Sequence, residues 1–204
     1  LSLIGARSTT GEIAIYPLVE NHHEHGILRL TLAPASGLGD RQLTAEGYLK
    51  ALLEHFQYVG VLTLELFQAG GRLFANEIAP RVHNSGHFSI EGAVTSQFEQ
   101  HLRAVLGLPL GSTELVGFSA MLNAIGSLPD PNLVLGVPDA HLHSYAKSPR
   151  AGRKVGHVTV RARDEHTLAE RLAVLGPKIW QRGGEPEAPT QRSPVHDARE
   201  SSQD

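Results

Sequence analysis

The sequence predicts an α+β fold in which antiparallel strands are backed by helices. Short apolar runs recur along the chain, and turn residues such as Gly70-Gly71 separate them, a pattern typical of β-hairpins. Segments near residues 41–56 and 96–106 instead place apolar residues at helical spacing. From about residue 112 short strands with Gly and Pro turns replace this texture, which indicates a second, smaller and strand-rich subdomain.

The first part of the chain should contain two hairpins and a helix. LSLIGAR and EIAIYPLVE flank the turn at 8–11 and predict the first hairpin, and ILRLTLAPA alternates as a strand with one buried face. VGVLTLELF and RLFANEIAP predict the second hairpin. Between the hairpins, apolar residues at i, i+3, i+4 and i+7 predict a helix: Leu49, Leu52, Leu53 and Phe56.

Two further helices carry start and stop signals. A capping box of Ser96 and Glu99 opens the first, and Gly107 and Pro109 end it. The last helix is expected at about 165–175, with Thr167 and Glu170 as the capping pair and Gly176-Pro177 as the stop. We expect the apolar stripes of all three helices to be core. GFSAMLNAIG, HLHSYAK and KVGHVTVRAR should be the strands of the second subdomain.

Composition limits the class of protein. The chain has 204 residues and is 41% hydrophobic, which is enough for one large domain or two small ones. Its net charge of -3 argues against duplex nucleic acid as the main partner. It has no cysteine, which excludes thiol nucleophiles and Cys-type zinc sites and suits a reducing compartment. No apolar stretch reaches the roughly 18 residues of a membrane span, so we expect a cytoplasmic protein.

The two ends suggest how the chain is divided. It begins inside an apolar run without an initiator Met, so we expect it to be part of a longer protein. Residues 183–204 are rich in Pro, Gly, Ser and charge and should form a disordered tail. The predicted domains are therefore 1–110, 111–182 and this tail.

The stretch 74-FANEIAPRVHNSGH-87 gathers polar groups where an apolar strand ends. Side chains alternate between the faces of a strand, so Glu65 and Glu77 share a face in only some registers of the hairpin. A two-residue Gly70-Gly71 loop would pair Glu65 with Asn76, whereas a loop one residue longer would pair Glu65 with Glu77. We favour the longer loop.

Carboxylates at facing positions need a partner. Facing Cβ atoms lie about 5 Å apart, where two charges repel by roughly 3 kcal/mol at an effective dielectric constant of 20. Protonation, a cation such as Arg81 or a divalent metal would relieve this, and oxygen ligands next to Asn76 suit Mg²⁺ or Mn²⁺ better than zinc. The competing interpretation is that Glu65 is a solvated strand residue. The flanking residues Leu64 and Leu66 disfavour it, because an unpaired buried charge is costly.

Other candidate sites carry weaker signals. HHEH, HNSGH and HLH invite a zinc interpretation, but no HExxH motif occurs and His83 and His87 span Ser-Gly shortly after Pro80. Ser85 and Ser89 lack an identifiable triad acid. In 150-RAGRKVGH-157 three cations surround a glycine and could bind phosphate, although basic loops are usually just solvated.

The segments around the two acids resemble a known family. GVLTLELF, followed by ANEIAPRVHNSGHFSIEG and TSQFEQHLRAVLGLPL, is similar to the nucleotide-site half of ATP-grasp ligases. NEIAPRVHNSGH resembles the signature of the 5-(carboxyamino)imidazole ribonucleotide synthases, and the resemblance runs from residue 1 to about 182. It implies the C-terminal half of an ATP-grasp fold. The family's N-terminal domain, nucleotide-binding lysines, glycine-rich lid and Tyr-Asp-Gly-Arg loop are not in this chain.

The resemblance implies a metal and nucleotide site. Two acids on adjacent strands would hold Mg²⁺, or Mn²⁺, against the phosphates of ATP, and they match Glu65 and Glu77. Asn76 and Glu77 would lie beside the nucleotide. His23 matches a histidine near the nucleotide.

The same resemblance implies an acceptor site. Arg81, His83 and Asn84 match the catalytic segment of the pocket where bicarbonate is phosphorylated to carboxyphosphate. Lys147 and Arg153 match residues that bind the phosphate of the substrate aminoimidazole ribonucleotide.

The implied activity is an ATP-dependent carboxylation in purine biosynthesis. Bicarbonate would be carried through carboxyphosphate to the amine of aminoimidazole ribonucleotide, with release of ADP and phosphate, by an enzyme that the family's habit suggests is a homodimer. Two alternatives stay open: another ATP-grasp ligase, such as a formate-dependent ribonucleotide formyltransferase, or an inactive remnant that lacks its N-terminal part.

Overall fold

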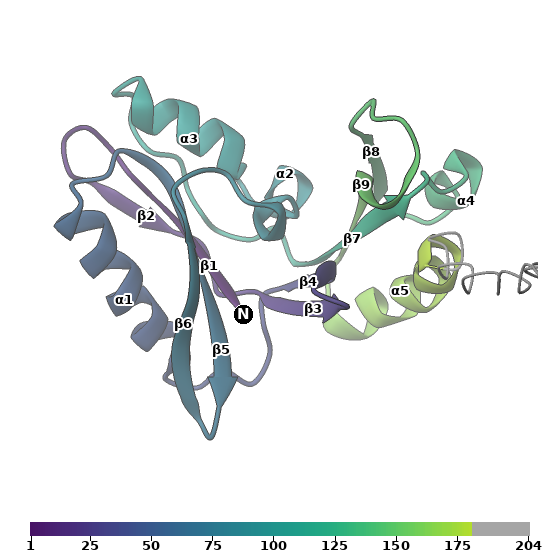
Figure 1. Ribbon diagram of the computed structural model, residues 1–204, viewed down its shortest axis with the longest axis horizontal. Coiled ribbons are helices and arrows are strands. Elements are labelled where there is room, and N and C mark those ends of the chain that lie inside the picture. The colour runs from purple at the N-terminus through teal and green to yellow at the C-terminus, as the bar shows by residue number, and fades with distance from the viewer. Residues whose placement is uncertain (181–204) are drawn as a thin grey trace, which may run out of the picture.

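The computed structural model describes residues 1–180 as two antiparallel sheets with helices packed on them (Figure 1). The first sheet has the order β2-β1-β5-β6, formed by β1 (Ser2–Arg7), β2 (Ile13–Ile15), β5 (Gly60–Ala69) and β6 (Arg72–Ala79). The second has the order β3-β4-β7-β9-β8, formed by β3 (Glu20–Glu24), β4 (Ile27–Ala33), β7 (Phe118–Gly126), β8 (Ala140–Ser144) and β9 (Arg150–Ala162). The helices are α1 (Arg41–His55), the 3₁₀ turn η1 (Asn84–Gly86), α2 (Ser89–Gly92), α3 (Gln97–Val105), α4 (Pro131–Leu135) and α5 (Glu165–Trp180).

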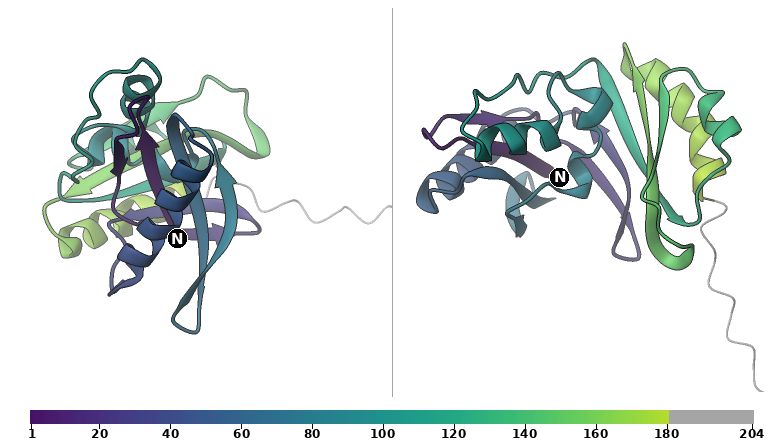
Figure 2. Two further views of the ribbon diagram at one scale, coloured as in Figure 1. Left: turned by 90° about the vertical axis from the view of Figure 1, so that its left-hand side faces the viewer. Right: turned by 90° about the horizontal axis from the view of Figure 1, so that it is seen from above.

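The first sheet lies between α1 and α3. Leu49 and Leu53 of α1 are fully buried against Leu62 and Leu64 of β5, so the predicted helix 41–56 and its stripe are confirmed, except that Phe56 is exposed. The opposite face of β5 packs on α3 (Figure 2). The predicted pairing of the first two strands is also confirmed.

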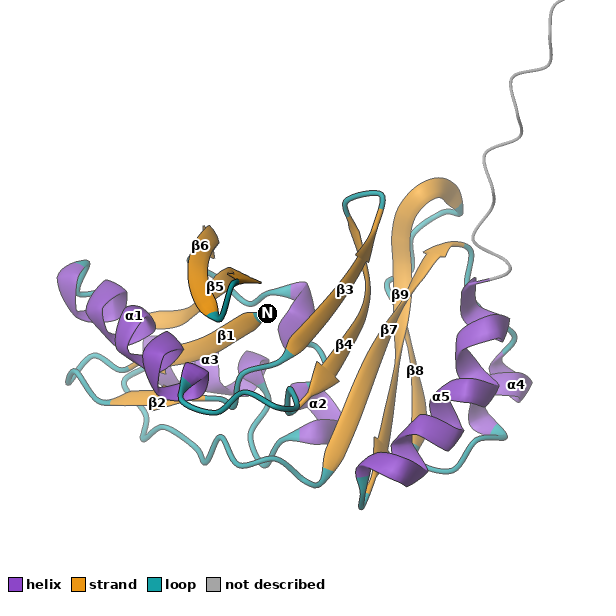
Figure 3. Ribbon diagram, turned by 90° about the horizontal axis from the view of Figure 1, so that it is seen from below, coloured by secondary structure: helices purple, strands orange, loops and turns teal. Residues whose placement is uncertain are grey.

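The second sheet draws strands from both predicted domains. β3 and β4 come from the part of the chain assigned to domain 1–110, yet β4 pairs with β7 and completes the C-terminal sheet (Figure 3). A cluster containing Val158, Val160, Leu168 and Leu175 joins this sheet to α5. The strand-rich C-terminal part predicted from the sequence is thus continued by strands from the first part of the chain, and Leu30 and Leu32 pack against this cluster. The boundary near residue 110 stays a prediction.

Helix α3 buries its polar side rather than its apolar side. Ser96 caps it as predicted, since the Ser96 side chain accepts a hydrogen bond from the Glu99 amide. The buried residues, however, are Gln97, Gln100 and Ala104. The predicted apolar stripe is exposed, with Leu102 at 58% and Leu106 at 68% of full exposure, so its assignment to the core was wrong.

The last helix begins at Glu165, as predicted, but its capping residue and its end differ from the prediction. Asp164 caps it, because its carboxylate accepts hydrogen bonds from both the amide and the hydroxyl of Thr167. The helix continues through Gly176-Pro177 to Trp180, and the buried side chain of Ile179 holds its last turn on the sheet. The predicted tail at 183–204 lies outside the described residues. None of the helices in residues 1–180 combines the length and apolar character that a membrane span requires.

Gln97 fixes the loop that follows β6. Its amide oxygen accepts from the His83 amide at 3.0 Å, and its amide nitrogen donates to the His83 carbonyl at 2.7 Å and contacts Nδ1 of His87 at 3.0 Å. Gly86 makes this possible, since a Cβ there would lie 2.4 Å from the Gln97 oxygen. The polar face of α3 therefore holds residues 83–87 against the first sheet.

Polar side chains also join the two sheets. Asn84 and Asn123 of β7 exchange a pair of hydrogen bonds, with nitrogen–oxygen distances of 3.0 and 2.7 Å. Glu91 of α2 accepts a 2.7 Å hydrogen bond from Nε2 of His143 on β8. These contacts fix the loop after β6 to the second sheet as well as to the first.

Next to this junction lies a cluster of imidazole rings. His157 of β9 stacks on His143, with ring centroids 4.3 Å apart and planes 8° from parallel, and lies 5.1 Å from the ring of His87. Burial, together with the smaller effect of neighbouring histidines, lowers the pKa of His157 to about 3 and that of His87 to about 4. Both rings are therefore neutral in the folded protein near pH 7.

We predict that Gly86→Ala destabilises the protein through Gln97. The added methyl group collides with an amide that the His83 backbone holds in place, so the free energy of unfolding should fall by about 1–3 kcal/mol. Urea denaturation measures this. In the double variant with Gln97→Ala the collision disappears, so the two losses should sum to more than the double variant loses; simple additivity would contradict the argument.

We predict that stability falls as pH drops from 7 to 5, in part because of His157. The unfolded histidine gains a proton near pH 6.5 and the folded one does not, so unfolding is favoured in acid by roughly 2 kcal/mol over this range. Urea unfolding at both pH values should give a smaller pH dependence for His157→Asn than for the wild type. His141→Gln, on the exposed face of β8, is the control and should keep the wild-type dependence. Equal dependence in all three proteins would contradict the prediction.

Candidate active site

The β5–β6 hairpin places Glu65 directly opposite Glu77. The turn is the two-residue Gly70-Gly71 loop, with φ values of +55° and +75°, so the predicted three-residue loop is wrong. The register shifts beside Glu65, where Asn76 is left over between Ala75 and Glu77. This bulge changes the parity of the register, so the two acids share a face of the sheet as predicted. The bulge, and not a longer loop, is the cause.

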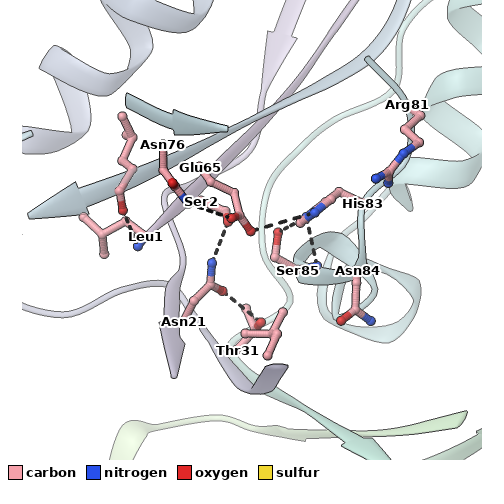
Figure 4. A network of polar contacts seen from close by, with 12 residues as sticks. Leu1, Ser2, Asn21, Thr31, Glu65, Asn76, Arg81, His83, Asn84 and Ser85 are labelled. Carbon is pink, nitrogen blue, oxygen red and sulfur yellow. Dashed lines mark hydrogen bonds and ion pairs between the residues drawn. The ribbon is translucent and has the colours of Figure 1, made fainter. Parts of the chain in front are cut away.

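Glu65 lies at the centre of a group of polar side chains (Figure 4). Its carboxylate is 13% exposed, with Oε2 3.4 Å from Nδ2 of Asn76 and Oε1 3.8 Å from Nε2 of His83. Glu77, on the neighbouring strand, is exposed. Thus one acid is held inside the site, and the other faces solvent beside it.

His83 presents a defined nitrogen to Glu65. Nδ1 of its ring contacts the Ser85 hydroxyl at 2.8 Å and accepts from the Ser85 amide at 3.4 Å, which leaves Nε2 directed at Glu65. Burial lowers the pKa of His83, while the Glu65 carboxylate acts in the opposite direction. His83 can therefore donate a hydrogen bond from Nε2 without carrying a charge.

The charge of Glu65 also affects the pKa of two further basic side chains, those of Lys154 and His23. Burial lowers the pKa of both Lys154 and His23, and in each case Glu65 partly offsets the effect. The predicted residue His23 is thus brought to the site from β3. Lys154, from the start of β9, was missed. Its signal was present in the basic segment 150–157, but the pattern alone did not distinguish it from its neighbours.

Arg81 and Asn84 lie on either side of His83. Arg81 is exposed, and its guanidinium donates to the carbonyl oxygen of Val82 at 3.0 Å. Its positive charge contributes to the lowered pKa of His83, so the two side chains are near each other. Asn84 instead points toward β7, where it pairs with Asn123.

An exposed aromatic pair continues the face that carries the acids. Phe67 follows Glu65 by two residues and so lies on the same face of β5, and its cross-strand partner is Phe74. They are 61% and 45% exposed. The hairpin therefore presents an apolar surface beside its carboxylates, which the sequence pattern had not identified as part of a site.

Lys147 and Arg153 make contacts within their own segment of the second sheet rather than with the acids. The Lys147 ammonium lies 5.2 Å from the centre of the Tyr145 ring, and Arg153 donates to the Ser148 hydroxyl at 3.2 Å. Both side chains lie in or beside the loop 145–149 between β8 and β9.

The donor set suits a hard divalent cation that also binds a ligand. Among residues 1–180, no three histidine, aspartate, glutamate or cysteine side chains gather closely enough to hold a metal alone. Magnesium is usually held by one or two carboxylates and by substrate phosphates, so a facing pair such as Glu65 and Glu77 is the expected protein share. These two acids therefore fit Mg²⁺ or Mn²⁺.

Two family models match this chain. The model described as the ATP-grasp domain matches residues 1–98, and the model described as the phosphoribosylaminoimidazole carboxylase C-terminal domain matches residues 119–171. The first match contains the β5–β6 hairpin and the loop after it. The second contains β8, β9 and the loop that joins them.

Curated relatives are similar over most of this chain but are about twice as long. The N5-carboxyaminoimidazole ribonucleotide synthase of Pseudomonas aeruginosa is 54% identical over 173 residues, which are 85% of this chain and 48% of the relative. The synthase of Escherichia coli is 44% identical over 180 residues, 88% of this chain and 50% of the relative. The chain thus spans about half the length of the relatives it matches.

Solved structures of these synthases are also similar to this chain. The N5-carboxyaminoimidazole ribonucleotide synthetase of Thermus thermophilus superimposes with a TM-score of 0.86 at 57% identity, over 90% of this chain and 51% of that one. A structure from Aspergillus clavatus, in complex with ADP and 5-aminoimidazole ribonucleotide, gives a TM-score of 0.78 at 37% identity over 88% of this chain and 50% of that one. The chain is therefore similar to the C-terminal half of the N5-carboxyaminoimidazole ribonucleotide synthases, and its residues 1–98 match the ATP-grasp domain.

Proposed function

We propose that the protein containing this chain uses ATP to carboxylate 5-aminoimidazole ribonucleotide with bicarbonate. The products would be 5-(carboxyamino)imidazole ribonucleotide, ADP and phosphate, in the de novo synthesis of purine nucleotides. The observation that carries this proposal is the facing pair Glu65 and Glu77 beside His83 and Arg81. The relatives of the chain are named as synthases of this product.

Glu65 and Glu77 would hold Mg²⁺ or Mn²⁺, with Asn76 beside them. The ion would neutralise charge on the phosphates of ATP while the terminal phosphoryl group is transferred. Phe67 and Phe74 offer an apolar surface on the same face, which suits the flat base of the nucleotide.

The phosphoryl transfer joins two anions, so its site needs positive charge and hydrogen-bond donors. A bicarbonate oxygen attacks the terminal phosphorus of ATP, and ADP leaves with the electrons of the broken bond. We assign Arg81 and Nε2 of His83 to the resulting carboxyphosphate, because charge spreads over its oxygens. Asn84 donates one amide hydrogen to Asn123, and we assign its second amide hydrogen to the same anion.

The last step needs the substrate amine close to the carboxyl carbon. The amine attacks that carbon, phosphate leaves, and the amine gives up a proton. Lys147 and Arg153 would bind the phosphate of the aminoimidazole ribonucleotide and so orient the amine. The half-buried Lys154 lies nearer to Glu65 and would add positive charge on the acceptor side of the site.

The setting of the protein is part of the proposal. We place it in the cytoplasm, as a homodimer that binds small molecules rather than nucleic acid. The exposed apolar side of α3, with Leu102 and Leu106, is a surface that a second subunit would cover. Light scattering of the purified complete gene product measures the mass that distinguishes a dimer from a monomer.

The decisive experiment supplies the complete gene product with ATP, magnesium and 5-aminoimidazole ribonucleotide. Phosphate release should require bicarbonate, and labelled carbon from bicarbonate should appear in the product. Formate in place of bicarbonate should give only background release. Formate-dependent turnover would instead identify a formyltransferase, and a folded protein without any turnover would identify an inactive relative.

We predict that Glu77→Gln lowers the rate of turnover by roughly 100-fold or more, because it removes a carboxylate that would hold the metal ion against the phosphates of ATP. Stability should change by less than about 0.5 kcal/mol, since Glu77 is exposed. Steady-state kinetics and urea unfolding measure the two effects. Glu54→Gln, an exposed acid on α1, is the matched control and should keep wild-type activity. A fully active Glu77→Gln would remove this residue from the metal site.

A further inference from the structure

Specific contacts hold the loop 145–149, which carries Lys147. Ala146, in the left-handed region with φ +53°, turns the chain just after Tyr145, and the Tyr145 amide donates to the Val155 carbonyl at 2.9 Å. The Lys147 ammonium then lies over the face of the Tyr145 ring. The direction of that ring therefore sets where the ammonium rests.

One hydrogen bond fixes the Tyr145 ring. Its hydroxyl lies 2.8 Å from Nδ1 of His157. Burial raises the pKa of Tyr145 to about 12 and lowers the pKa of His157, so the phenol donates and the neutral Nδ1 accepts. Nε2 of His157 is buried and has no hydrogen-bond partner within residues 1–180. Within the part of the chain that the structure describes, the one hydrogen bond of this imidazole is thus made to Tyr145.

His157 in turn cannot change its orientation easily. The side chain is only 2% exposed, and the ring of His143 covers one of its faces in a parallel stack. His143 is itself tied to Glu91 of α2 by its 2.7 Å hydrogen bond. A chain of contacts therefore runs from α2 through two stacked imidazoles to the phenol beneath Lys147.

The buried nitrogen without a partner is unusual, because leaving such a group unsatisfied costs free energy. Packing alone would be served as well by an apolar ring. A histidine at this place is explained if its other nitrogen is needed to hold Tyr145.

We propose that Tyr145 and His157 are positioning residues that hold Lys147 in the orientation for binding the substrate phosphate. This inference rests on the proposed function, in which Lys147 binds the phosphate of 5-aminoimidazole ribonucleotide. Neither Tyr145 nor His157 needs to touch the substrate. They act by limiting the directions that the Lys147 side chain samples before the phosphate arrives, which lowers the entropy lost on binding.

Tyr145→Phe in the complete gene product tests this most directly, because it removes the hydroxyl and keeps the ring under Lys147. The KM for 5-aminoimidazole ribonucleotide should rise about tenfold, the effect of one lost hydrogen bond. The kcat and the KM for ATP should stay near wild-type values. Tyr48→Phe, which removes an exposed hydroxyl on α1, is the control and should change nothing.

A pair of variants at His157 separates positioning from packing. Asparagine can place an acceptor where Nδ1 lies, whereas glutamine reaches toward Nε2. His157→Asn should therefore retain most of the affinity for the substrate, and His157→Gln should resemble Tyr145→Phe. If both raise the KM equally, or if KM follows only the loss of stability in urea, the positioning role is wrong.

Phosphate titration of the 204-residue chain gives a readout that does not depend on turnover. Inorganic phosphate should shift the NMR amide signals of Lys147 and Ser148, with weaker binding in Tyr145→Phe. Equal shifts in both proteins, or none in the wild type, would overturn the inference. If the complete wild-type protein does not carboxylate its substrate, the proposed function fails, and this titration still decides whether the Tyr145–His157 contact controls an anion site.

Discussion

The site depends on a single unpaired residue in the β5–β6 hairpin. A two-residue turn alone would place Glu65 opposite Asn76 and send Glu77 to the far face of the sheet. The bulge at Asn76 reverses that parity, so both carboxylates and the aromatic pair Phe67 and Phe74 share one face. Removing one residue from β6 would leave the hairpin intact and separate the acids, so the bulge rather than the turn decides that the two carboxylates face each other.

The rest of the framework serves to hold one loop beside those acids. Gln97 fixes the backbone of His83 from the side of the first sheet, and Asn123 fixes Asn84 from the second. Both partners are fully buried, so these hydrogen bonds do not compete with water. The loop is thus held from both sheets. The backbone and Nδ1 of His83 are both hydrogen-bonded, and this leaves Nε2 of its ring facing Glu65.

The sequence predicted the local elements well and their assembly less well. The hairpins, α1 and the Ser96 cap follow from short-range patterns, which local physics decides. The inward face of α3 could not be read from periodicity, because the buried Gln97 is needed by a loop fourteen residues earlier, whereas the leucines on the other side remain exposed. Likewise β4 joins a strand that is distant in sequence, a choice that no local signal contains. The pairing of Glu65 with Glu77 was predicted correctly, but from a loop that is one residue too long. The bulge that actually produces this pairing could not be predicted, because it leaves no recognisable pattern in the sequence.

The balance of charge explains why the basic loop of the second sheet matters. In the proposed reaction, a nucleoside triphosphate carries more negative charge than one divalent ion neutralises, and bicarbonate and a sugar phosphate add further anions. Glu65 and Glu77 are matched near the site by Arg81 and Lys154, so these acids and bases roughly cancel before any ligand binds. The remaining compensation would have to come from other cations, and Lys147 and Arg153 are the residues that we assign to it. Cations in a loop bind an anion strongly only if their orientation is fixed beforehand. A freely moving ammonium is screened by solvent and loses conformational entropy when it binds. The aromatic and imidazole contacts beneath Lys147 would meet that requirement, and the proposed role of Lys147 would then link the packing of β8 and β9 to the electrostatics of the site on β5 and β6.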